Sequence, residues 1–178
     1  KPTGEKDPFA LRRHAIGILR LLNDGNIALG LDTLLAQALS VFQHQFDSDA
    51  TLQALDEFIY DRLAGNLRDA GHSAQEVEAV LALKPQLIAD IFKRLNAVQA
   101  FAALTEAPSL AAANKRVGNI LKKAEGIIEP NINPALLQED AERALAQALE
   151  QVQPQAQQAF AAGNYTDSLK ALAALKAP

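Results

Sequence analysis

The chain has 178 residues, of which 49% are hydrophobic and 5% aromatic, and it contains no cysteine, methionine or tryptophan. Without cysteine it can form no disulfide, no thiolate nucleophile and no zinc site with cysteine ligands. The net charge of −4 and the pI near 5.4 argue against a general nucleic-acid coat protein, so any contact with nucleic acid must be confined to a local patch.

Amphipathic helical patterns follow one another along the chain. Asp7-Pro8 predicts a helix start, because an acidic N-cap precedes proline at the first helical position, and Ser73 with Glu76 fits a capping box. Gly71 and Gly126 are typical of helix ends. The expected helices span about residues 8–22, 32–45, 50–69, 74–84, 85–104, 107–125, 135–153 and 165–175. The predicted fold class is therefore all-α, with one or more bundles of about seven to nine amphipathic helices.

Several classes of site are not expected. No run of about 18 apolar residues predicts a membrane span, and the first nine residues have no apolar signal-peptide core. The three histidines, His14, His44 and His72, show no metal-ligand spacing, so we expect no metal site and no catalytic residues. Because methionine is absent even at position 1, we expect a piece of a longer protein or a processed chain.

The stretch AAANKRVGNILKK, residues 111–123, has two different faces. At about 100° per residue, five apolar side chains fall in one arc that should face the core: Leu110, Ala113, Val117, Ile120 and Leu121. Asn114 falls on the same arc, where a buried amide would hold a neighbouring backbone group. The opposite side forms what we call the basic stripe: Lys115, Arg116, Asn119, Lys122 and Lys123.

The basic stripe has two interpretations. A cluster of charges on an amphipathic helix is usually its solvated face, and Lys122 and Lys123 suit the negative end of the helix dipole without any partner. The contrast with the other helices favours a functional surface, because most of their outer faces are mixed or acidic. Only Glu125 offsets the four cations.

Other candidates are weaker. Arg12 and Arg13, with His14 and Arg20, form a second basic cluster that is more typical of a surface or a severed interface than of a site. Lys93 and Arg94 would extend the basic stripe if their helix packs beside residues 107–125. Tyr60 and Tyr165 could stack on bases, although a half-buried tyrosine is the more frequent outcome.

Two blocks of sequence resemble the bacterial glycyl-tRNA synthetase beta subunit family. ANKRVGNILKK, preceded by LNAVQAFAAL and followed by NINPALLQEDAE, resembles the family's C-terminal region. KPTGEKDPFALRRHAIGILRLL resembles a segment that lies upstream in the same subunit. The two blocks occur in the family's order and cover both halves of the chain.

The resemblance implies a tetramer of two alpha and two beta subunits in the cytoplasm. In this tetramer the alpha subunit would contain the ATP-dependent aminoacylation site, and the beta subunit would bind tRNA-Gly. Residues 1–46 would be the C-terminal helices of a preceding His-Asp-type helical domain. Residues 47–178 would be an anticodon-binding bundle similar to that of arginyl-tRNA synthetase. This piece would then carry no catalytic residue and no cofactor of its own.

The chain departs from the family pattern in two places. Residues 167–170 read Asp-Ser-Leu-Lys where the bundle's namesake motif is Asp-Ala-Leu-Arg, which keeps the acid, the leucine and the cation. The family continues with an apolar segment beyond residue 178, so we expect the bundle to be truncated and to expose apolar surface. The metal-site residues of the His-Asp-type domain are not expected in this piece.

On this resemblance, four cations of the basic stripe would neutralise tRNA phosphates: Lys115, Arg116, Lys122 and Lys123. Arg116 and Asn119 would contact base edges, because both can hydrogen-bond directionally. Secondary contacts would come from Arg12, Arg13, Lys93 and Arg94. Two alternatives stay open: an interaction module that docks on a partner protein through Arg12, Arg13 and Arg20, and the remnant of a helical hydrolase.

Overall fold

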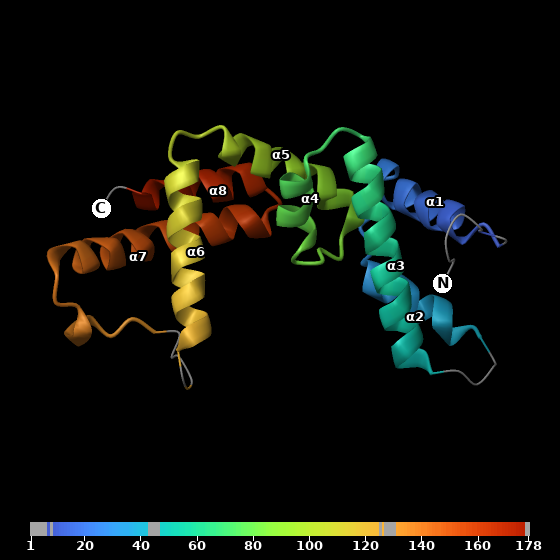
Figure 1. Ribbon diagram of the computed structural model, residues 1–178, viewed down its shortest axis with the longest axis horizontal. Coiled ribbons are helices and arrows are strands. Elements are labelled where there is room, and N and C mark those ends of the chain that lie inside the picture. Colours follow the sequence, from blue (N-terminus) through green and yellow to red (C-terminus); the bar gives the residue numbers. More distant parts are fainter. Residues whose placement is uncertain (1–6, 8, 43–46, 125, 127–130, 177–178) are drawn as a thin grey trace. The chain divides into compact units, whose positions relative to one another are not determined.

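The computed structural model describes residues 7, 9–42, 47–124, 126 and 131–176. Within these residues the chain forms eight α-helices and no β-strand, which confirms the all-α class and the expected number of helices (Figure 1). The helices are α1 (Leu11–Asp24), α2 (Leu31–Ser40), α3 (Ser48–Asp69), α4 (Ala74–Leu81), α5 (Ile91–Ala102), α6 (Ala107–Lys123), α7 (Asp140–Ala161) and α8 (Tyr165–Ala173). Two short 3₁₀ turns, Ile88–Asp90 and Pro134–Leu136, lie between helices, and a third, Ala174–Lys176, follows α8.

The chain divides into two compact units, Lys1–Leu95 and Asn96–Pro178. This division does not coincide with the domain boundary expected between residues 46 and 47, because α3 packs against both α1 and α2 inside the first unit. The polar stretch from Asp47 is instead the start of α3, where the Asp47 carboxylate accepts a hydrogen bond from the Ala50 N–H. The assignment of residues 47–178 to an anticodon-binding bundle stays a prediction.

The core of the first unit lies where α1, α3, α4 and the Ile88–Asp90 turn meet. Its side chains come from the apolar positions that recur at helical spacing, which is why the helices pack with these faces inward. The most deeply buried large side chains are Leu31, Leu67, Ile88, Ile91 and Leu95.

The first helix begins later than its sequence predicts. Pro8 was expected at the first helical position, whereas α1 begins at Leu11. The Asp7 carboxylate still satisfies two of the free backbone donors, because it accepts hydrogen bonds from the N–H groups of Leu11 (2.8 Å) and Arg12 (2.9 Å). The acidic cap was therefore identified correctly, but it acts from four residues before the helix rather than from the position next to it.

The turn between α3 and α4 follows the sequence closely. Gly71 has a φ of 99°, a left-handed conformation that glycine adopts without strain. The capping box is present: Ser73 Oγ accepts from the Glu76 N–H (3.3 Å), and the Glu76 carboxylate accepts from the Ser73 N–H (2.8 Å). Both ends of this turn are fixed by local chemistry.

Several helix boundaries differ from the predicted ones: α2 ends at Ser40 rather than near residue 45, and α7 begins at Asp140 rather than near residue 135. Two further differences have identifiable reasons. The α-helix expected from about residue 85 begins at Ile91, because Gln86 and Leu87 pair with the residues at the start of α2. Here the Leu31 N–H donates to the Gln86 carbonyl (3.0 Å), and the Asp32 N–H donates to Gln86 Oε1 (3.0 Å). The helix expected to end before Pro154 instead runs through that residue as α7. Proline costs α7 one backbone hydrogen bond, which packing against α8 offsets.

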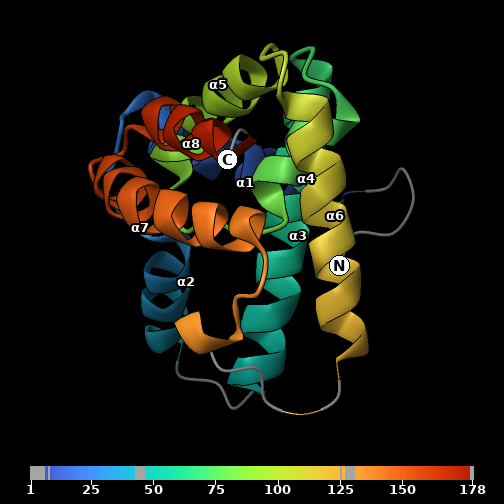
Figure 2. The same cartoon turned by 90° about the vertical axis from the view of Figure 1, so that its left-hand side faces the viewer.

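In the second unit, α7 and α8 lie side by side as a helical hairpin (Figures 1 and 2). Gly163, with a φ of 76°, makes the turn between them. The Phe160 and Tyr165 rings meet edge to face with centroids 5.1 Å apart, and Ala156, Tyr165 and Ala173 are buried. This hairpin is the main packed element among the described residues of the second unit.

Tyr60 provides a pH-dependent test of the first unit. Its hydroxyl donates to the Pro85 carbonyl (3.0 Å), and burial, followed by the charges of Asp56 and Asp32, raises the pKa of Tyr60 to about 12. Between pH 10 and 12 the unfolded chain loses the phenol proton while the folded chain keeps it, so stability must fall as pH rises through this window. We expect a decrease of up to about 1.4 kcal/mol per pH unit in the free energy of unfolding.

Urea unfolding at several pH values from 9 to 12 measures this slope. Tyr60→Phe is the matched control, because it keeps the ring and removes the ionisable group. The difference in slope between the two proteins reports on Tyr60 alone, since lysines titrate in both. Equal slopes in the two proteins would show that the phenol does not carry the effect.

Candidate nucleic-acid interface

The basic stripe lies on α6, a helix whose bounds are close to those that the sequence predicts. The helix was expected at about residues 107–125 and forms at Ala107–Lys123, with Pro108 in its first turn. Ser109 Oγ donates to the Glu106 carbonyl (2.8 Å), and the helix ends with Lys122 and Lys123 in its last turn. Cations at this end are stabilised by the helix dipole, so the helix itself accounts for part of the charge pattern.

The apolar arc of α6 is not buried, which contradicts the expectation that it faces the core. Val117 is 52% exposed, Ile120 59% and Leu121 50%, and Asn114 is exposed as well. Among the described residues of the second unit, α7 packs mainly against α8, and Figure 2 shows α6 standing apart from this pair. Helical periodicity identified an amphipathic helix correctly, but it could not say whether a partner for the apolar arc lies within this chain.

All five residues of the basic stripe are exposed on α6. Elsewhere in the described chain, cations pair with nearby carboxylates, as Lys84 does with Asp56 (2.6 Å) and Arg143 with Asp140 (2.7 Å). No such ion pair forms at Lys115, Arg116, Lys122 or Lys123 among the residues that the structure describes. Glu125, the acid expected to offset them, lies outside the described residues. The stripe therefore presents its positive charges to solvent.

Most of the stripe borders a shallow depression on the surface of α6. Its lining is Ala112, Lys115, Arg116, Asn119, Ile120 and Lys123. Lys122 does not line it. Ile120 was expected in the core on the basis of its helical spacing, but it lines the charged depression instead. The depression combines an apolar floor with cationic and amide groups, which suits a ligand with both flat apolar parts and negative charge.

The expected secondary contacts belong to the first unit. Arg13 is exposed, whereas Arg12 is half-buried. Lys93 Nζ pairs with Asp90 Oδ1 (3.0 Å), so its charge is partly neutralised, and Arg94 is half-buried. Because these residues and α6 lie in different units, a continuous basic surface that joins them stays a prediction.

Tyr60 and Tyr165 are 7% and 8% exposed, so neither offers a ring face for base stacking. Among the described residues, no group of three or more His, Asp or Glu side chains is arranged to hold a metal ion. None of the described helices combines the length and the apolarity needed to cross a membrane.

Comparison with known proteins identifies relatives along the entire chain. The family described as "Glycyl-tRNA synthetase beta subunit" matches residues 1–82. A glycine–tRNA ligase beta subunit from Methylobacillus flagellatus is 76% identical over all 178 residues, and one from Delftia acidovorans is 59% identical over 177 residues. In each comparison the chain spans 25% of the relative's length. The chain therefore belongs to the glycyl-tRNA synthetase beta subunit family and corresponds to about a quarter of such a subunit.

Proposed function

We propose that this chain is the tRNA-binding part of the beta subunit of a glycine–tRNA ligase. In this proposal it recognises the anticodon region of tRNA-Gly, while the alpha subunit performs the ATP-dependent glycylation in the cytoplasm. The chain contributes binding affinity for tRNA and selection of the correct tRNA, and it does not form the ester bond to glycine. It therefore needs no catalytic residue and no cofactor of its own. Its partners are tRNA-Gly and the alpha subunit.

The exposed basic stripe on α6, whose cations form no ion pair with any residue that the structure describes, is the observation that carries this proposal. Four cations lie on one side of a helix in a chain whose net charge is −4. Cations that meet backbone phosphates release condensed counterions, which supplies much of the affinity of proteins for nucleic acid. The acidic remainder of the chain repels phosphate and so restricts binding to this surface.

Selection of bases follows from the polar groups in the same depression. Unpaired anticodon bases are splayed out and can be read on their edges, unlike bases inside an RNA helix. The Arg116 guanidinium and the Asn119 amide are directional hydrogen-bonding groups beside the apolar side chain of Ile120. We assign phosphate contacts to the four cations and, in addition, base-edge contacts to Arg116 and Asn119; the four cations are Lys115, Arg116, Lys122 and Lys123.

A gel-shift titration of the chain with tRNA-Gly and with an anticodon variant of the same tRNA tests the function. We expect binding of tRNA-Gly, with the variant about ten-fold weaker, because one lost base contact costs roughly 1–3 kcal/mol by analogy with base readout in DNA. Equal binding of both tRNAs would restrict the role of the chain to phosphate contacts. No binding of either tRNA would contradict the proposal.

The exposed apolar arc of α6 favours a second candidate, a helical module for subunit assembly without RNA contact. Val117, Ile120 and Leu121 form an apolar surface on one helix, and such surfaces are typical of protein interfaces. Co-purification of the chain with an alpha subunit, unchanged by ribonuclease and abolished by Leu121→Glu, would support this candidate. Under the tRNA proposal, Leu121→Glu should leave the salt dependence of tRNA binding unchanged.

A further inference from the structure

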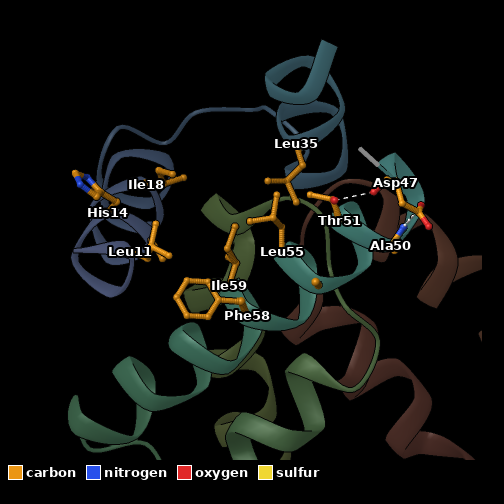
Figure 3. Close-up of a pocket in the computed structure, with 12 residues that line it drawn as sticks. Leu11, His14, Ile18, Leu35, Asp47, Ala50, Thr51, Leu55, Phe58 and Ile59 are labelled. Atoms are coloured by element: carbon orange, nitrogen blue, oxygen red, sulfur yellow. Dashed lines mark hydrogen bonds between the residues drawn. The ribbon is translucent and has the colours of Figure 1, made fainter. Parts of the chain in front are cut away.

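An apolar groove lies between α1, α2 and α3 in the first unit (Figure 3). Its cavity volume is about 500 Å³. Figure 3 shows side chains of all three helices pointing toward this space: Leu11 and Ile18 from α1, Leu35 from α2, and Leu55, Phe58 and Ile59 from α3. The sequence did not predict a binding surface at these residues, because each also fits an ordinary helical core pattern.

Two of the three polar side chains that line the groove form hydrogen bonds at the start of α3. Asp47 Oδ1 accepts from the Ala50 N–H (3.0 Å), and Thr51 Oγ1 donates to the Asp47 carbonyl (2.6 Å), so both serve the start of α3. His14 lies at the edge of the groove and is exposed. Pockets for small molecules place a few polar groups to orient the ligand, whereas this lining offers almost only aliphatic and aromatic surface. The chemical complement of the groove is a row of apolar side chains.

We propose that this groove receives an apolar face of another helix from the same beta-subunit polypeptide, outside the quarter that this chain represents. The curated relatives are about four times as long as the chain, so most of such a subunit lies beyond these residues. The groove-forming residues fall within residues 1–82, which match the family as part of that longer subunit. Covalent connection gives an intramolecular helix a high effective concentration, so apolar contact alone holds it without a charged rim.

Thiol labelling tests the proposal, because the chain has no cysteine and one introduced cysteine is its only thiol. Ala54 is exposed and lines the groove, whereas its neighbour Gln53 is exposed and does not line it. Ala54→Cys and Gln53→Cys are therefore a matched pair. Each is made in the 178-residue chain and in the Methylobacillus flagellatus beta subunit with this chain in place of its matching quarter. Mass spectrometry of the peptide that carries the new cysteine gives the rate of maleimide modification in each protein.

We expect the cysteine at position 54 to react at least about ten-fold more slowly in the full-length subunit than in the 178-residue chain. The cysteine at position 53 should react at similar rates in both. Slow reaction at position 54 already in the dilute chain, or only at high chain concentration, would overturn the proposal by showing that the chain itself or a second copy covers the groove. Protection that appears only when the alpha subunit is added, or that never appears, would also overturn it.

Hydrogen exchange provides a measurement that needs no substitution. Amides of the M. flagellatus subunit that match α1 and α3 should exchange more slowly in the full-length protein than in its isolated matching segment. If the substituted subunit does not fold, this comparison of exchange rates still tests whether the groove is covered in the full-length protein. Equal exchange in the two proteins would overturn the proposal. Binding of tRNA is not involved in either measurement, so the outcome is independent of the proposed function.

Discussion

Replacing Lys115 and Arg116 of α6 with glutamate is expected to weaken the binding of tRNA-Gly by about 20-fold or more at about 0.15 M salt. Each lost phosphate contact removes the release of roughly 0.7 to 0.9 counterions, and two contacts together account for this factor. The two new carboxylates would also repel phosphate. The slope of the logarithm of affinity against the logarithm of salt concentration should become shallower by about 1.4 to 1.8. Filter binding over a range of salt concentrations measures both quantities.

Arg68→Glu with Lys170→Glu is the matched control. Both residues are exposed outside the basic stripe, and the double substitution changes the net charge by the same amount. We expect this control to change affinity only slightly, because it changes the net charge without removing any phosphate contact assigned to the basic stripe. If the stripe variant keeps both its affinity and its salt slope, the stripe is only the solvated face of α6. If the two variants weaken binding equally, net charge rather than the stripe controls affinity.

Short-range chemistry was the part of the fold that the sequence predicted well. The capping box at Ser73 and Glu76 depends on residues three positions apart, and the turn at Gly71 depends on one backbone conformation. The Asp7 cap was identified, although α1 starts at Leu11. These features could be predicted because each depends on interactions within a few residues of sequence.

Contacts between distant residues account for two of the boundaries that were wrong. The segment from residue 85 does not become α-helical before Ile91, because the carbonyls of Pro85 and Gln86 accept hydrogen bonds from Tyr60 and Leu31, which are far away in the sequence. Residues 84–104 contain nothing that reveals these partners. For the same reason the sequence did not predict the groove. Leu35 and Phe58 fit ordinary core patterns, and the space beside them arises from the packing of α1, α2 and α3.

For the candidate site, the residues of the basic stripe were predicted but their surroundings were not. All five were expected on the exposed side of α6, and all five are exposed. Helical spacing also predicted that Ile120 faces the core, whereas this side chain lines the depression together with Arg116 and Lys123. Periodicity reports the direction of a side chain relative to its own helix. Burial depends on what packs against that helix, and here the apolar arc stays exposed.

The core of the first unit yields the largest expected effect on stability. Leu67 of α3 is fully buried and lines a small cavity together with Leu19, Leu63, Ile88 and Ile91. Leu67→Ala is expected to lower the free energy of unfolding by about 2 to 5 kcal/mol, through lost burial and an enlarged cavity. A unit of this size is typically stable by roughly 5 to 14 kcal/mol, so the variant should lose a large share of its stability. Urea unfolding followed by circular dichroism measures the loss.

Leu21→Ala is the matched control for Leu67→Ala. Leu21 lies on α1 in the same unit but is 68% exposed, so the same truncation there removes little buried surface. We expect a change within about 0.5 kcal/mol, as for most exposed positions. Hydrogen exchange locates the effect, since amides of α3 should lose protection in Leu67→Ala while amides of α7 and α8 in the second unit keep theirs. Similar losses for the two variants would contradict the assignment of Leu67 to the core. Loss of protection in both units would instead show that they unfold as one cooperative structure.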